Sequence, residues 1–231
     1  MKTTSDGHFN VLLRAPTDII PHLARGELHW KKGYSACELA TSWVSAGDIP
    51  ANVRTVLDQN FVYENARFVE GFFERSVDLR TPGFPSETDL MVIVATADGL
   101  AVIGVEGKVE EPLGPLVDDW LRADDRGHEN RRRRLESLCA TLGLDAEQVG
   151  DLRYQLLHRT ASTVYEAQRY MAAHALMLVH SFSQKNSWFE DFAAFADGMG
   201  QPVQEPGQMS SVKTCEGVGL ALAWVKDEPA P

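Results

Sequence analysis

The chain has 231 residues, of which 44% are hydrophobic and 24% are charged, a composition typical of a globular protein and not of a disordered or fibrous one. Its 33 Asp and Glu residues against 22 Lys and Arg give a formal net charge of −11, so the whole-protein field repels nucleic acid and anionic membrane at long range. Three distant cysteines form no zinc pattern, and the chain has no apolar leader or membrane-length apolar run. We therefore expect a cytoplasmic protein with no membrane partner, folded as a single domain over residues 1–231.

The N-terminal part, residues 1–59, is expected to form a helical extension. Ser35 and Glu38 have the spacing of a capping box, and the apolar stripe that follows predicts a helix from about residue 36 to residue 45. Pro50 suits the first turn of a second, shorter helix that carries Val53 and Leu57 on one side.

A third helix and a β-hairpin are expected next. Apolar and aromatic residues recur at helical spacing from Asn65 to Arg75, ahead of a turn-rich segment. Two β-rich runs, Leu90 to Val94 and Leu100 to Val105, then flank a turn signal at residues 97–99. Their nearly continuous apolarity predicts inner strands that are covered on both faces.

The rest of the chain alternates helical and strand patterns. Residues 117–135 are polar and predict a loop that leads into a helix. Apolar spacing then predicts a long helix over residues 152–175, a strand at 176–179, a helix at 188–195 and a last strand at 220–225. This interleaving predicts an α/β fold, or α+β with a central mixed sheet flanked by helices.

Three polar residues stand at one end of the predicted hairpin. A turn centred on residues 97–98 places Asp89 opposite Glu106, and a turn centred on residues 98–99 places it opposite Lys108. Because strand side chains alternate, Glu106 and Lys108 share a face in either register. The hairpin therefore gathers an aspartate, a glutamate and a lysine.

Two opposed carboxylates destabilise a sheet unless a cation lies between them. Carboxylate oxygens, a backbone carbonyl and water suit Mg²⁺, which often completes its shell with a substrate phosphate. Lys108 could orient or help deprotonate an attacking water and counter charge in the transition state. The residue types thus favour a phosphodiester substrate.

Asp89, sixteen intervening residues and Glu106-x-Lys108 resemble the signature of the PD-(D/E)XK nuclease superfamily, although Thr88 stands where the family name has Pro. The resemblance implies a restriction-endonuclease-like core over residues 60–182, with its first strand near Val77 to Arg80. Residues 183–231 would add a helix, a loop and a strand.

The same resemblance implies that Asp89, Glu106 and the Gly107 position hold Mg²⁺ or Mn²⁺, while Lys108 assists the attacking water. Some members of the superfamily add a helical Glu or a later Gln. The corresponding candidates in this chain are Glu70, Glu74 and Gln155.

Arginines supply candidate contacts to substrate phosphates. Arg131, Arg132, Arg133 and Arg134 form one run, and Arg159 lies on the long predicted helix beside the site. The alternative is that the run is a solvated helix start paired with nearby glutamates, and that Arg159 is ordinary surface charge.

The sequence leaves three functions open. The first is a Mg²⁺-dependent nuclease that hydrolyses nucleic-acid phosphodiesters, with DNA preferred to RNA. The second is a nuclease-fold binding or regulatory protein without turnover, which the net charge favours. The third is a metal-dependent hydrolase of a smaller phosphorylated substrate, which needs no extended cationic surface. No phosphate loop, dinucleotide-binding motif or serine nucleophile elbow is present in the sequence.

Overall fold

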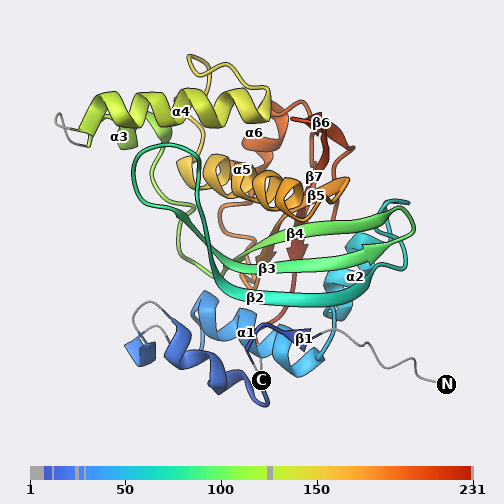
Figure 1. Ribbon diagram of the computed structural model, residues 1–231. Coiled ribbons are helices and arrows are strands. Elements are labelled where there is room, and N and C mark those ends of the chain that lie inside the picture. Colours follow the sequence, from blue (N-terminus) through green and yellow to red (C-terminus); the bar gives the residue numbers. More distant parts are fainter. Residues whose placement is uncertain (1–7, 12, 24–25, 29, 124–126, 230–231) are drawn as a thin grey trace.

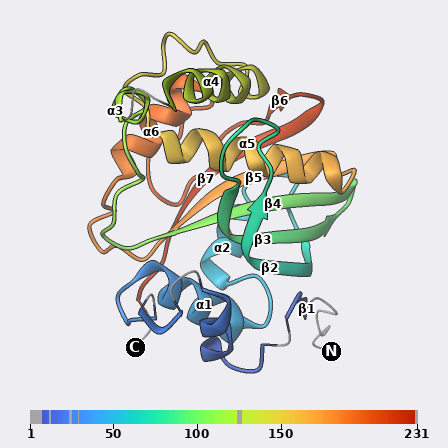
Figure 2. The ribbon, with the colours of Figure 1, turned by 60° about the vertical axis from the view of Figure 1, so that its left-hand side comes forward.

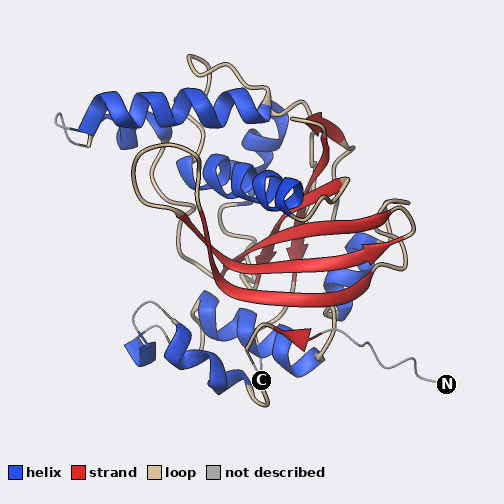
Figure 3. Ribbon diagram, in the orientation of Figure 1, coloured by secondary structure: helices blue, strands red, loops and turns tan. Residues whose placement is uncertain are grey.

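A mixed sheet of seven strands forms the centre of the protein in the computed structural model, which describes residues 8–229 apart from 12, 24–25, 29 and 124–126. The strand order is β1-β2-β3-β4-β5-β7-β6. β2, β3 and β4 form an antiparallel meander, and β5 and β7 continue the sheet in parallel with β4 (Figures 1 and 3). The strands are β1 His8–Phe9, β2 Arg67–Val77, β3 Ser86–Thr96, β4 Gly99–Lys108, β5 His174–Ser181, β6 Lys213–Cys215 and β7 Val218–Lys226. The α/β class with a central mixed sheet is confirmed.

Helices cover both faces of the sheet (Figures 1 and 2). One face packs against α5 and α6, with α4 on the side of α5 away from the sheet, and its core includes Met91, Val102 and Leu157. The other face packs against α1 and α2 in a core that includes Trp43 and Ile103. The helices are η1 Pro16–His22 and η2 Gly26–Leu28, both 3₁₀, and α1 Ser35–Ala46, α2 Ala51–Leu57, α3 Val117–Arg122, α4 His128–Leu142, α5 Tyr154–Arg169 and α6 Phe189–Gly198. Within the described residues, none of these helices has the length and apolarity needed to cross a bilayer.

The β3–β4 hairpin has the register that places Asp89 opposite Glu106. Thr96 pairs with Gly99, and Leu90 pairs with Val105, so the turn is centred on residues 97–98. Residues 90–94 of β3 and 101–108 of β4 are buried, because helices lie on each side of these strands.

The helix predicted over residues 65–75 is wrong, since this segment is β2. Its pairing with β3 slips between Phe68 and Glu70, and such a bulge resets the alternation of a strand. The two residues Phe72 and Phe73 after it are both half-buried, so the apolar positions imitate helical spacing. The strand expected near Val77 to Arg80 is likewise misplaced, because β2 ends at Val77.

Several element boundaries also differ from the predicted ones. Tyr34, not Ser35, is the N-cap of α1, and Glu38 accepts a hydrogen bond from the Gly33 amide at 2.7 Å instead of closing a capping box. Residues 117–135 contain α3 and the first half of α4 where a loop was expected. The long helix ends at Arg169, because Met171 adopts a left-handed conformation and β5 begins soon after it.

A buried histidine ties α1 to β5 and to the segment after β7. The Trp43 indole Nε1 donates to His180 Nδ1 at 3.2 Å, and His180 Nε2 lies 3.1 Å from Asp227 Oδ2. Because an indole N–H can only donate, Nδ1 must be an acceptor and the imidazole proton must lie on Nε2. Burial lowers the pKa of His180, so this ring is held neutral.

Candidate functional site

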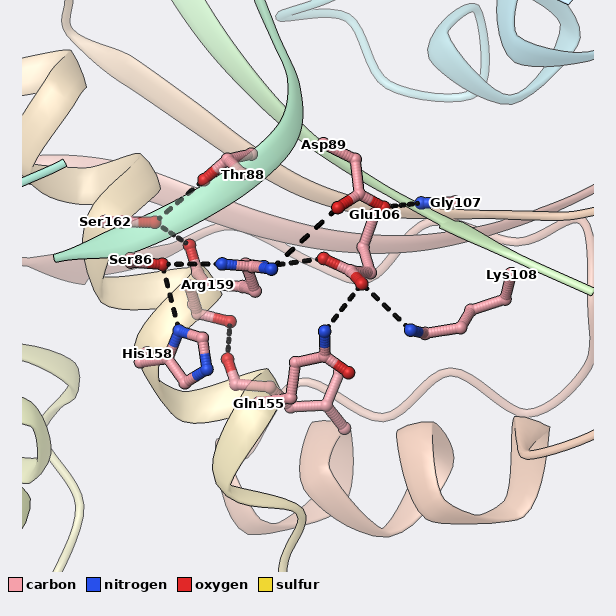
Figure 4. Close-up of polar contacts among 12 residues, drawn as sticks. Ser86, Thr88, Asp89, Glu106, Gly107, Lys108, Gln155, His158, Arg159 and Ser162 are labelled. Atoms are coloured by element: carbon pink, nitrogen blue, oxygen red, sulfur yellow. Dashed lines mark hydrogen bonds and ion pairs between the residues drawn. The ribbon is translucent and has the colours of Figure 1, made fainter. Parts of the chain in front are cut away.

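The three hairpin residues meet on the face of the sheet that packs against α5 (Figure 4). Asp89 lies near the start of β3, and Glu106 and Lys108 end β4, in phase with the α5-facing Val102. The Asp89 side chain is 26% exposed, whereas those of Glu106 and Lys108 are only 3% and 5% exposed. Asp89 is therefore the member of the trio that a ligand reaches first.

Glu106 is the centre of the cluster. Its Oε1 accepts hydrogen bonds from Lys108 Nζ at 2.9 Å and from Gln155 Nε2 at 2.7 Å. Its Oε2 accepts from Arg159 Nε at 2.6 Å. Both carboxylate oxygens are thus engaged by donors, two of which are cations.

Arg159 links the two carboxylates. Besides its bond to Glu106, its Nη2 lies 3.8 Å from Asp89 Oδ1. The other oxygen of Asp89 accepts from the Gly107 amide at 2.9 Å. Arg159 therefore places one positive charge between the two opposed carboxylates.

Ser86 and His158 hold the guanidinium of Arg159 in place. Arg159 Nη1 donates to Ser86 Oγ at 2.9 Å, and the same oxygen lies 2.9 Å from His158 Nδ1. Burial and the neighbouring Arg159 lower the pKa of His158 to about 3. The ring is therefore neutral, and its Nδ1 can accept a hydrogen bond from the hydroxyl group of Ser86.

The two carboxylates have opposite electrostatic environments. Burial, followed by repulsion from Glu106, raises the pKa of Asp89 to about 7. Burial would also raise the pKa of Glu106, but attraction to Arg159 and Lys108 outweighs it and lowers the pKa to about 2. For Lys108, burial is outweighed by Glu106 and Asp89, and its pKa rises above the usual value. At neutral pH, Glu106 and Lys108 are charged and Asp89 is close to its midpoint.

Glu74 brings a third carboxylate to the site. It lies in β2 between Phe73, which pairs with Leu90, and Arg75, which pairs with Thr88, and so stands opposite Asp89. Its φ of 50° is left-handed, which is uncommon for a residue with a side chain and marks local strain. Burial is the largest cause of the raised pKa of Glu74.

The remaining predicted residues Gln155, Glu70 and Gly107 have different positions relative to the site. Gln155 reaches Glu106, as described above, whereas Glu70 pairs with Ile93 further along the sheet and lies 3.8 Å from His8. Gly107 is explained by packing, since a Cβ there would lie 3.3 Å from the Leu39 side chain of α1. Gly107 therefore allows helix α1 to pack closely against β4.

The arginine run lies on α4, which Figure 1 shows beyond α5 as seen from the sheet. Arg132 forms ion pairs with Glu136 and Glu147, and Arg133 forms one with Glu129. Arg134 is buried and donates to Thr81 Oγ1. The structure does not bring Arg131, Arg132, Arg133 or Arg134 to the carboxylate site, whereas it places Arg159 at the centre of that site.

Magnesium fits this donor set in its chemistry. Mg²⁺ is commonly held by one or two carboxylates together with water and substrate phosphate, and Asp89 and Glu106 supply two carboxylates. No group of three or more His, Cys, Asp or Glu side chains arranged to hold a metal occurs in the described part of the chain. The carboxylates of Glu74, Asp89 and Glu106 exceed the cations Lys108 and Arg159 by one charge when all are ionised. A divalent cation would relieve that excess, with Asp89 and Glu106 as its ligands.

The fold and the site define an α/β protein with a buried cluster of carboxylates and cations at one end of its central hairpin. The chain belongs to the family described as a domain of unknown function, DUF6946, whose model matches residues 12–229. No curated protein and no solved structure matches this chain.

Proposed function

We propose that this protein is a metal-dependent hydrolase that cleaves nucleic-acid phosphodiesters. The supporting observation is the convergence of Asp89, Glu106 and Lys108 at one end of the β3–β4 hairpin, with an excess of negative charge around Asp89. Within residues 60–182, a three-stranded meander is followed by helices α3 to α5 and by β5 parallel to β4, an order similar to the one expected for the nuclease core, although the leading helix expected at residues 65–75 is the first strand of the meander.

Each residue has a role that follows from its environment. Asp89 and Glu106 would hold Mg²⁺ or Mn²⁺, which lowers the pKa of bound water and offsets charge on a phosphoryl oxygen. Lys108, which is kept protonated by Glu106, would stabilise negative charge that develops on the phosphate and would orient the attacking water. Gln155 and Arg159 would keep the Glu106 carboxylate in position.

One observation favours a second candidate, a binding or regulatory protein without turnover. Both oxygens of Glu106 are already engaged, by Lys108 and Gln155 on one side and by Arg159 on the other. A metal that binds Glu106 must therefore use the remaining lone pair of Oε2 or displace one of these donors. If a metal ion never replaces Lys108 or Arg159 at Glu106, the cluster has a structural role only.

Metal titration of the Asp89→Asn variant separates these functions. This substitution removes a charge but keeps an oxygen that can accept the Gly107 amide, so the fold is expected to survive. Wild-type protein should bind Mn²⁺ or Mg²⁺ in calorimetry and cleave DNA in their presence, and Asp89→Asn should do neither. Asp98→Asn, at the exposed turn of the same hairpin, is the matched control and should behave as wild type.

Equal metal binding by wild-type and Asp89→Asn protein, or none by either, would refute the metal site. If wild-type protein binds metal but releases no product from DNA, RNA or small phosphodiesters, the non-catalytic candidate is favoured. Cleavage by wild-type protein that Lys108→Met abolishes would exclude that candidate.

A further inference from the structure

A cavity of about 220 Å³ lies beside Asp89, between the catalytic end of the sheet and the N-terminal helices. Its apolar wall includes Leu23, at the end of η1, and Ala36 and Leu39 of α1. Its polar wall includes Asp89 and Arg159. The N-terminal extension thus forms one side of the space next to the proposed catalytic group.

The N-terminal extension is held in place by packing on both sides of the cavity. Leu23 packs with the fully buried Ile19 and with Ala40 in a small core of its own. At the other side of the cavity, the Leu39 side chain and the Ser35 carbonyl lie so close to β4 that a Cβ at Gly107 would be 3.3 to 3.4 Å from them. A substrate that approaches Asp89 from the side of the N-terminal helices therefore passes through this cavity.

The size of the cavity limits what can enter. Pockets for drug-sized ligands occupy roughly 300 to 1,000 Å³, so this cavity accepts about one ring system or one nucleoside-sized group. A base-paired strand can place a nucleoside in this cavity only if the nucleotide leaves the stack, which costs a few kcal/mol.

The charges near the cavity also argue against binding of duplex DNA. Glu74, Glu87 and Asp89 line it together with Arg159, and two arginines of α4, Arg132 and Arg133, are paired with glutamates. Binding of duplex DNA draws most of its non-specific affinity from cations that neutralise phosphates. The cavity is instead suited to an apolar, planar group that packs against Leu23 and Ala36.

We propose that the substrate is a phosphodiester whose flanking nucleoside or aryl group is unstacked and enters the cavity under the N-terminal helices. Such a group occurs in an unpaired nucleic-acid strand and in a free small phosphodiester. The proposal rests on the hydrolase function above and specifies the substrate class of the same site. The N-terminal extension is then the element that determines specificity.

The test compares three substrates in the presence of Mn²⁺. These are thymidine 5′-p-nitrophenyl phosphate, a linear single-stranded oligonucleotide and a relaxed, covalently closed circular duplex. Cleavage of either of the first two without cleavage of the closed duplex supports the proposal, and which of them reacts identifies the source of the diester. Cleavage of the closed duplex at a rate comparable to that of the single strand would overturn it.

Cavity variants give a second readout. Ala36→Trp fills the cavity and should lower kcat/KM for the reactive substrate by about tenfold or more, because the reacting phosphate is displaced from Asp89. Ala46→Trp, the same change at the exposed end of α1, should leave kcat/KM unchanged. Leu23→Ala enlarges the cavity and should raise the activity on bulkier aryl diesters, and melting curves of all three variants check their folding. Wild-type activity in a folded Ala36→Trp variant refutes the cavity assignment alone, whereas no cleavage of any substrate refutes the hydrolase function itself.

Discussion

Asp89→Asn is expected to stabilise the protein at neutral and alkaline pH and to have little effect on stability at acidic pH. An aspartate whose pKa is raised in the folded state binds its proton more tightly there than in the unfolded chain. As pH rises through 3.8, the unfolded chain loses this proton first and folding becomes less favourable. The penalty grows until the pH passes about 7, the pKa of Asp89 in the folded protein, and is constant above that.

The size of the effect follows from the two pKa values. A difference of about three pH units between 3.8 and about 7 corresponds to about 4 kcal/mol in the free energy of unfolding. Because the Asp89 side chain is 26% exposed, water screens part of this penalty. We expect Asp89→Asn to gain between about 2 and 4 kcal/mol at pH 8.

Urea unfolding at pH 4, 6 and 8 measures this gain as the difference between variant and wild type. The gain should be close to zero at pH 4, should increase at pH 6 and should be largest at pH 8, while Asp98→Asn should show no such trend. A gain that is the same at pH 4 and pH 8, or a loss of stability at pH 8, would refute the account of Asp89 as a carboxylate held at an electrostatic cost.

Three further predictions concern the surroundings of the site. Arg159→Met should lower the free energy of unfolding by about 3 to 5 kcal/mol at pH 7, since it removes the buried cation that links Asp89 to Glu106; a loss below about 1 kcal/mol in urea unfolding would contradict this role. Wild-type protein should lose stability as pH falls from 7 to 5, because the lowered pKa values of His180 and His158 keep both rings neutral in the fold; each ring contributes a slope of up to about 1.4 kcal/mol per pH unit, and the raised pKa of Asp89 acts in the opposite direction and offsets one of them. His180→Phe should flatten that slope in the same assay, and an unchanged slope would exclude His180 as its source. Gly104→Ala should cost about 1 to 3 kcal/mol, because its Cβ would lie 2.1 Å from Thr163 Oγ1, and the added change Thr163→Ala should recover part of this loss if the clash is its cause.

The hairpin could be predicted from the sequence because its information is local. Two apolar β-rich runs around a short turn specify both strands, and the alternation of side chains then fixes which face Glu106 and Lys108 share. β2 was not predictable in this way. Its bulge after Phe68 and the left-handed Glu74 disturb the two-residue period, and both irregularities depend on pairing with a strand that is distant in sequence.

The sequence placed Arg159 beside the site as a candidate phosphate contact, but its role as the partner of the two carboxylates was not predicted, for a different reason. A charged residue on a helix is usually solvated, so the sequence favoured surface charge. A stronger signal was present on α5, where Gln155, Arg159, Ser162 and Glu166 recur at intervals of three and four residues along a helix that is otherwise mostly apolar. A polar stripe on a buried helix indicates polar partners on the facing strand, and here those partners include Glu106.

The irregular course of β2 also affects how the protein behaves at high concentration. Among the described residues, the outer edge of β2 is paired with β1 only at Glu70 and Gly71. A long, straight strand left open in this way offers unpaired amides and carbonyls to a strand of another molecule, which is a common route to aggregation. The bulge between Phe68 and Glu70 and the left-handed residue Glu74 interrupt the regular strand geometry on either side of the short pairing. These irregularities, one of which is the carboxylate-bearing residue opposite Asp89, therefore make the edge a poor template for a second molecule.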